Sequence, residues 1–148
     1  MADLSWAREA GADRRAALDR DAKTGATGAR GLASAMFDGL IVHLWRRLGS
    51  GFKETVDAYN AGGRFSDLSF FADNERIIVE RRHHPTFSVQ LSLDRSARAI
   101  LMTVGDEGQN AQTEPLEIVF VDQELLLWHD GQTENGYQLA RRALKPRF

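Results

Sequence analysis

Apolar and polar residues alternate most strictly at residues 87–94, which read Phe-Ser-Val-Gln-Leu-Ser-Leu-Asp. Successive side chains of a strand point to opposite faces, so this pattern predicts a strand with one buried face and one wet face. Similar apolar runs flank it, and we predict six strands, at 67–72, 76–81, 86–93, 97–104, 114–121 and 124–128. Short runs of turn-forming residues join most of them, which is typical of an antiparallel meander. Only residues 105–113 make a long polar connection, which we expect to be a mobile loop.

A longer period precedes the strands, from about residue 32 to 61. Apolar residues recur there every three or four positions and form one stripe along a helix: Phe37, Ile41, Leu44, Trp45, Leu48, Phe52, Val56 and Tyr59. Gly49 and Gly51 interrupt this segment, and each costs about 1 kcal/mol relative to alanine inside a helix. Because the stripe continues beyond them, we predict one bent helix rather than two.

Weaker patterns mark the two ends of the chain. Residues 4–23 have helix-forming composition with Trp6 as the one large anchor, so they predict a peripheral helix or an arm ordered by a partner, and residues 23–31 read as a glycine-rich linker. Residues 134–144 predict a closing helix that is capped by Thr133, buries Tyr137 among others and is stopped by Pro146. The expected fold is therefore α+β. A helical arm at 1–31 precedes a single domain at 32–148, in which one long amphipathic helix packs on a six-stranded antiparallel β-meander.

Several strands carry apolar residues on both faces, as in the pairs Ile77-Ile78 and Ile100-Leu101. A sheet with one wet face does not need such pairs. The long helix covers one face, so the other face must be covered by the terminal helices, a second subunit or a ligand. If a second subunit covers it, we expect a homodimer with these interface residues: Leu101, Val119, Val121 and Leu126.

Composition narrows the classes of protein. The chain has 148 residues, 43% hydrophobic and 27% charged, which suits one soluble globular domain. Cysteine is absent and the start of the chain lacks the apolar core of a secretory signal, so we expect a cytoplasmic location with no membrane association. Arginine greatly outnumbers lysine, which suggests a bacterial source with a GC-rich genome. A net charge of −2 argues against nucleic-acid binding. We expect the basic residues of the C-terminal segment to complement the dipole of the last helix or, as the alternative, to bind an anionic partner: Arg141, Arg142, Lys145 and Arg147.

No motif predicts a metal, a cofactor or a catalytic residue. The histidines lack a metal-binding spacing, and the adjacent His83 and His84 would point to opposite faces of a strand. The glycines at 25, 28 and 31 lack the rest of a phosphate-binding loop. The carboxylates beside the long loop offer a pair for acid–base chemistry, although loop carboxylates are usually only solvated: Asp106, Glu107, Glu114 and Glu117.

Three functions remain compatible with the sequence. We expect first a non-enzymatic cytoplasmic binding or protein-interaction domain. The alternative is a small-molecule-binding cavity protein or an enzyme, with a pocket between the sheet and the long helix formed by Trp45, Phe71, His83, Phe120, Trp128 and His129. A chaperone-like or toxin-neutralising protein would instead expose an apolar patch beside residues 106–117.

Overall fold

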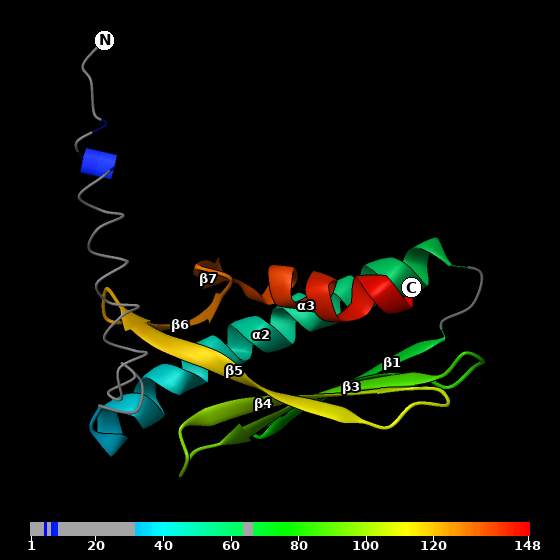
Figure 1. The fold of residues 1–148 in the computed structure, drawn as a ribbon, viewed down its shortest axis with the longest axis horizontal. Helices are drawn as coiled ribbons and strands as arrows, with labels where there is room; N and C mark the ends of the chain where they lie inside the picture. Colours follow the sequence, from blue (N-terminus) through cyan, green and yellow to red (C-terminus); the bar gives the residue numbers. More distant parts are fainter. Residues whose placement is uncertain (1–4, 6, 9–31, 64–66) are drawn as a thin grey trace.

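The computed structural model describes residues 5, 7, 8, 32–63 and 67–148. In these residues one long helix, α2 (Ser34–Gly62), lies in the hollow of a curled antiparallel sheet, and a shorter helix, α3 (Gly136–Leu144), packs beside it (Figure 1). The α+β class is confirmed. The helix and linker expected over residues 1–31 lie outside the described residues, apart from Ser5, Ala7 and Arg8.

Over residues 67–148 the sheet has seven strands, which are neighbours in the order of the sequence. They are β1 (Leu68–Ala72), β2 (Arg76–Arg81), β3 (Phe87–Asp94), β4 (Ala99–Asp106), β5 (Gln112–Val121), β6 (Glu124–His129) and β7 (Gln132–Glu134). The meander is confirmed, and the count of six strands is wrong by one. The loop expected at 105–113 is also shorter, because β4 and β5 extend into both of its ends and leave residues 107–111.

The missed strand, β7, consists only of polar residues, so no alternation announces it. The signal lies instead in Asp130-Gly131, whose φ angles of 50° and 80° form a two-residue turn between the paired residues His129 and Gln132. Asp-Gly is among the strongest short-range signals for a hairpin. The strands predicted from the sequence end at residue 128, so this hairpin was missed.

Helix α2 runs unbroken through Gly49 and Gly51, so the prediction of one helix is confirmed. Gly51 lies where α2 meets the start of α3. A Cβ atom there would lie 2.4 Å from the backbone carbon of Gly136, and a Cβ on Gly136 would lie 2.5 Å from the carbonyl oxygen of Arg47. The glycine that weakens α2 locally therefore allows the two helices to touch through their backbones.

Helix α3 begins later than the sequence predicts, since Thr133 and Glu134 belong to β7. Asn135 is the N-cap: its side chain accepts the N–H of Gln138, whose side chain accepts the N–H of Asn135 in return. The predicted cap at Thr133 is wrong, and so is the burial of Tyr137, which is 54% exposed and donates a hydrogen bond to Glu54.

Strand β5 belongs to the sheet in two halves. Gln112–Leu116 pairs with β4, whereas Glu117–Val121 pairs with β6. Asp122 and Gln123, both with positive φ, form the two-residue turn to β6. The backbone N–H and C=O groups of Val121, and of every second residue before it in β5, therefore point to the side on which β6 lies. Pro115 is one of these alternate residues and has no N–H to donate. The first half of β5 therefore keeps one open edge, and this edge lies beside α3 (Figure 1).

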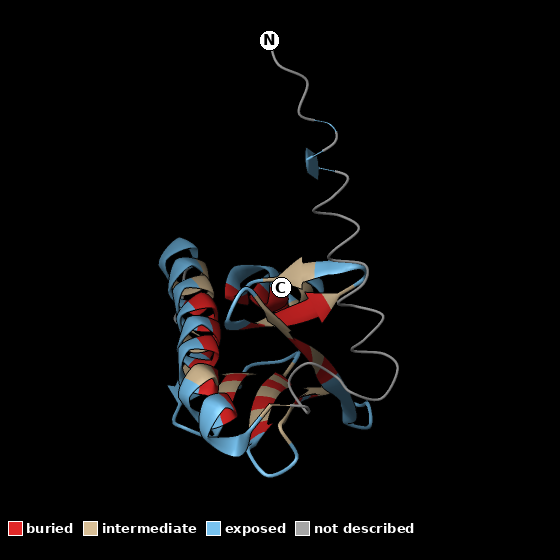
Figure 2. Ribbon diagram, turned by 90° about the vertical axis from the view of Figure 1, so that its left-hand side faces the viewer, coloured by how far each residue is buried: buried red, intermediate tan, exposed pale blue. Residues whose placement is uncertain are grey.

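The concave side of the sheet and the helices enclose the main core, as the banded burial of the strands in Figure 2 shows. The convex side of β1–β4 is mostly polar, with hydrogen bonds between Gln90 and Ser92 and between Thr103 and Thr113. A smaller second cluster lies on the other face of β5 and β6: Val119 and Trp128, with Val121 and Leu126 packed against them. Within the described residues, no helix is long and apolar enough to cross a membrane.

Candidate functional site

The six residues predicted to line one pocket lie in different places. Trp45 belongs to the core and donates from Nε1 to the carbonyl oxygen of Asp73 at 2.7 Å. Phe71 lies on the convex face and is 49% exposed, while Phe120 is half-buried against the core. The space between α2 and the sheet is filled by side chains, because the main residues of the helix stripe are fully buried.

The remaining three lie at opposite ends of the molecule. His83 is exposed in the turn between β2 and β3. Trp128 joins the second cluster, and His129 is half-buried with its Nε2 3.2 Å from Asp130. Among the described residues, no group of three or more histidines and carboxylates is placed to hold a metal ion.

The interface residues predicted from the sequence do not all lie together in the structure either. Leu101 lies on the convex face of β4 with 37% of its surface exposed. Val119 is 4% exposed, and Val121 and Leu126 pack against it. These three therefore belong to the second cluster, while Leu101 is the one that faces solvent.

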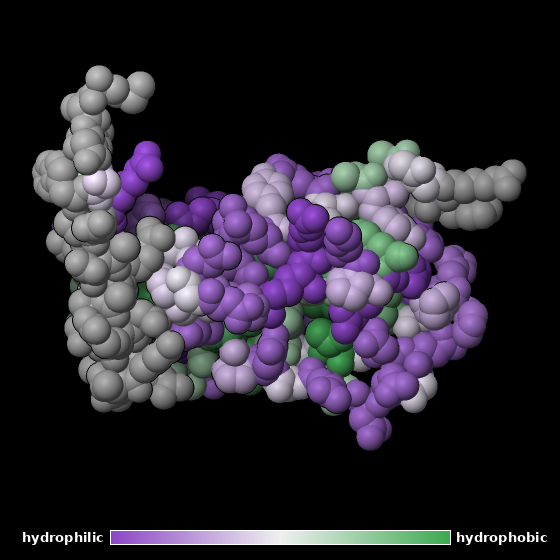
Figure 3. Space-filling model, turned by 45° about the horizontal axis from the view of Figure 1, so that its top comes forward, coloured by the Kyte–Doolittle hydropathy of each residue, from purple (hydrophilic) through white to green (hydrophobic). Residues whose placement is uncertain are grey.

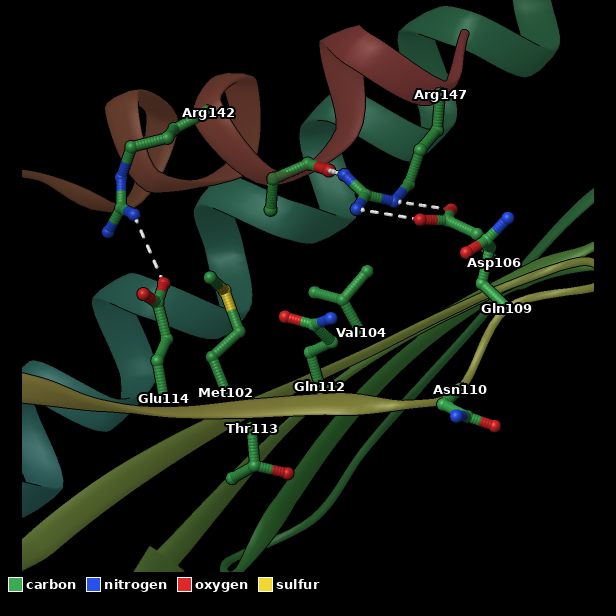
Figure 4. Close-up of a pocket in the computed structure, with 11 residues that line it drawn as sticks. Met102, Val104, Asp106, Gln109, Asn110, Gln112, Thr113, Glu114, Arg142 and Arg147 are labelled. Atoms are coloured by element: carbon green, nitrogen blue, oxygen red, sulfur yellow. Dashed lines mark hydrogen bonds and ion pairs between the residues drawn. The ribbon is translucent and has the colours of Figure 1, made fainter.

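A polar cleft lies elsewhere, between the concave face of β4 and β5 and the C-terminal segment formed by α3 and the 3-10 turn η1 (Lys145–Arg147). We call it the β5–α3 cleft (Figure 4). Its volume is about 540 Å³. It is lined by Met102, Val104, Asp106, Gln109, Asn110, Gln112, Thr113, Glu114, Arg142, Ala143 and Arg147.

Side chains alternate between the two faces of β4 and β5, and this alternation determines which of them form the floor of the cleft. Met102 and Val104 share a face with the buried Ile100, and Gln112 and Glu114 share one with the buried Leu116, so their side chains rise toward α3. Figure 4 shows these side chains between the two arginines. The open edge of β5 forms the mouth, since no strand in the described part of the chain pairs with it.

An ion-pair group closes one end of the cleft. Arg142 donates from Nε and Nη2 to the two carboxylate oxygens of Glu134, at 2.9 and 3.0 Å. Its Nη1 also reaches Glu114, at 3.3 Å. The hydrogen bond to Glu134 raises the pKa of Arg142, so this guanidinium is a permanent cation.

A second ion pair closes the other end. Arg147 places Nε and Nη2 at 2.8 and 3.1 Å from the carboxylate of Asp106, and its Nη1 donates to the carbonyl oxygen of Ala143 at 2.6 Å. Arg81 donates to the carbonyl oxygen of Arg147 at 2.9 Å, and the ring of Phe148 lies 4.4 Å from that of Tyr59. The end of the chain is thereby fixed as a wall of the cleft.

Two smaller clefts adjoin the β5–α3 cleft. One, of about 310 Å³, shares Asp106 and Arg147 and lies beside Glu107. Glu107 accepts the backbone N–H of Thr86 and contacts Nδ1 of His84 at 2.7 Å, and the Thr86 hydrogen bond is the main cause that lowers the pKa of Glu107. This carboxylate joins the loop before β3 to the loop after β4.

The other small cleft, of about 250 Å³, shares Glu114 and Arg142 with the β5–α3 cleft and also includes Glu134, Trp128 and His129. Two of the six predicted pocket residues thus lie near the main cleft without lining it. The carboxylates noted in the sequence each line the β5–α3 cleft or one of the two smaller clefts: Asp106, Glu107, Glu114 and Glu117. The arginines that meet them were interpreted from the sequence as partners of the helix dipole, with an anionic partner as the alternative, and their spacing in the sequence gives no signal of these contacts.

The arrangement is suited to binding. It combines fixed cations, carboxylates, side-chain amides and a small apolar floor within one concave surface. Figure 3 shows the side of the molecule that carries α3, where hydrophilic side chains cover most of the surface and hydrophobic atoms show only in small patches. Comparisons with protein-family models, with curated proteins and with solved structures find no match for this chain.

Proposed function

We propose that this protein is a non-enzymatic binding domain and that the β5–α3 cleft is where it holds its ligand. The observation that carries the proposal is the cleft itself: about 540 Å³, with two arginines held by carboxylates on either side of an apolar floor. Ligand sites commonly have volumes of about 300–1,000 Å³ and a few convergent polar groups. The cytoplasmic location expected from the sequence belongs to the same proposal.

Preorganisation supports this role. Glu134 is 8% exposed in its side chain and holds Arg142 through two parallel hydrogen bonds, and Asp106 contacts two nitrogens of Arg147. Paired side chains lose little further rotamer entropy when a ligand binds, so less of the binding free energy is spent on ordering them.

The test is a titration of ¹⁵N-labelled protein with small polar compounds of either charge and of none, followed by NMR. The side-chain amides of Gln109, Asn110 and Gln112 report on the cleft, and the amide of Gln90 on the convex face is the control. We expect at least one compound to shift the three cleft signals in a saturable way while Gln90 stays unchanged.

A matched variant makes the result specific. Val104→Trp fills the apolar floor with an indole from a position that is half-buried in the wild type. Binding should be lost in this variant while the rest of the spectrum is retained. If no compound of any charge shifts the cleft amides, the proposed function is wrong.

A homodimer is the second candidate, and the convex face is the observation that favours it. Phe71 and Leu101 are 49% and 37% exposed there, and the latter pairs across the strands with Pro115. Native mass spectrometry and sedimentation velocity at high micromolar concentration measure the state. A dimer that Leu101→Glu dissociates supports this candidate, and a monomer at all concentrations contradicts it.

A further inference from the structure

We infer that the ligand of the β5–α3 cleft carries an ammonium or guanidinium group on a short alkyl chain, and that Glu114 is the carboxylate that binds this cation. The inference rests on the proposed function, because it names the ligand class of the same cleft. It follows from the charges, the unused hydrogen-bonding capacity and the shape of the lining.

The charges around the two arginines do not cancel. Arg142 and Arg147 meet three carboxylates, those of Glu134, Glu114 and Asp106. Glu134 and Asp106 each face two nitrogens of one arginine. Each of these pairs is neutral, so the charge of Glu114 is the one left in excess.

Glu114 also has unused hydrogen-bonding capacity. It receives one contact, from Nη1 of Arg142 at 3.3 Å, and its side chain is 53% exposed at the mouth of the cleft. An ionised carboxylate has about four acceptor positions, so most of its positions are free for a ligand. An anionic ligand has the opposite problem, because it would have to displace Glu134 from the two hydrogen bonds of Arg142 or Asp106 from its ion pair with Arg147.

The floor beside Glu114 suits an alkyl chain. Met102 and Ala143 are buried, and Val104 is half-buried between the two ion pairs. Figure 4 shows Met102 next to Glu114 and Val104 toward Arg147. A chain of a few methylenes lying over this floor would remove apolar surface from water, at about 0.8 kcal/mol for each methylene fully buried.

Two sources present this chemistry: a free amine, or a lysine or arginine side chain of a partner protein. The experiment therefore uses four probes: pentylamine, pentan-1-ol and pentanoate, which have the same chain length, and N-acetyl-lysine N-methylamide, which presents the side chain of a protein. Each is titrated into the full-length protein, with the amides of Gln109 and Gln112 as readout. We expect pentylamine to bind more tightly than the alcohol, and pentanoate to bind least.

The matched variants are Glu114→Gln and Glu80→Gln, the second of which lies on the convex face of β2. Because Glu114 is half exposed, its loss should weaken pentylamine about fivefold. Glu80→Gln should leave the affinity unchanged. Affinity for the lysine derivative equal to or above that for pentylamine would assign the site to a protein side chain, and weaker affinity would assign it to a free amine.

Two sets of results would contradict the inferred ligand class or the proposed function. If pentanoate or pentan-1-ol binds best, or if Glu114→Gln leaves the affinity for pentylamine intact, the ligand class is wrong while the cleft remains a binding site. If none of the probes binds, and the wider set of polar compounds also fails, the proposed function falls as well.

Discussion

At the scale of single residues, the contact between Gly51 and Gly136 decides how closely α2 and α3 approach. A methyl group on Gly51 would lie 2.4 Å from a backbone carbon, which the rigid helix start cannot avoid without moving. Helix propensity favours alanine over glycine by about 1 kcal/mol, but the clash acts in the other direction. Packing between the helices therefore outweighs local propensity at this position.

We predict that Gly51→Ala lowers the free energy of unfolding by roughly 2–3 kcal/mol. The control is Gly39→Ala, on the exposed side of the same helix with no atom within 4 Å of the added methyl, which should stabilise by about 1 kcal/mol. Urea unfolding followed by circular dichroism measures both. Equal stabilisation by the two variants would show that the helices do not touch there.

Two exposed carboxylates organise turns between strands. Asp73 accepts the backbone N–H groups of Glu75 and Arg76, and Asp94 accepts that of Ala97. These hydrogen bonds favour the charged carboxylate and lower the pKa of both residues. A lowered pKa in the folded state adds stability that is complete above the ordinary carboxyl pKa of about 3.9 and is lost as the pH falls through the lowered value.

The double variant Asp73→Asn with Asp94→Asn should therefore be less sensitive to acid than the wild type. Below about pH 4 the wild type loses the contribution of both turns, while the variant has no charge there to lose. Urea midpoints at a series of pH values between neutrality and acid provide the comparison. An unchanged slope of stability against pH would contradict the role given to these two carboxylates.

At the scale of elements, Pro115 protects the exposed edge of β5. Its position places the missing N–H on the side where no strand pairs, and proline at an edge is a common device against strand-to-strand association. The same feature keeps the mouth of the β5–α3 cleft free of a further strand. Strand β5 thus serves the sheet on one edge and the cleft on the other.

Pro115→Val should restore a backbone donor at this edge and promote concentration-dependent association. Thr113→Val is the control: it adds a β-branched apolar residue nearby on the same strand but no new N–H group. Sedimentation velocity over a wide range of concentrations distinguishes them. Association in both variants would assign the effect to hydrophobicity rather than to the edge.

The elements with a strong period were predictable, and those without one were not. The stripe from Phe37 to Val56 and the alternation of β3 identify α2 and the meander, because burial on one face repeats at a fixed spacing. The strand β7 has no apolar face, and a capping box formed by Asn135 and Gln138 sets the start of α3 two residues later than expected. Local hydrogen bonding, which hydrophobic patterning does not record, determines both.

The contacts in the β5–α3 cleft were even less predictable from the sequence than the strands and helices. The sequence directs attention to Asp106 and Glu114, since carboxylates stand out beside a polar loop. It does not reveal that Arg147 and Arg142 meet them, because these partners are 41 and 28 residues away along the chain. Only the return of the C-terminal segment across the concave face brings the four together, and this segment begins where α3 meets α2 at Gly51 and Gly136.

At the scale of the whole molecule, the sheet curls around α2 and its concave face is not filled to the edge. Helix α2 lies in the hollow, and α3 with η1 packs against α2 (Figure 1). The space left between this C-terminal segment and the concave face of β4 and β5 is the β5–α3 cleft, which is lined mostly by polar groups. The architecture thus places one polar concavity beside a packed apolar core, which is the basis of the proposed binding function.

The most direct test of this account is a crystal structure of the full-length protein soaked with pentylamine. The account predicts the alkyl chain over Met102 and Val104, with its nitrogen within hydrogen-bonding distance of the carboxylate of Glu114. The pairs Arg142–Glu134 and Arg147–Asp106 should remain intact. An amine bound at another surface while the cleft stays empty at saturating concentration would contradict the central claim.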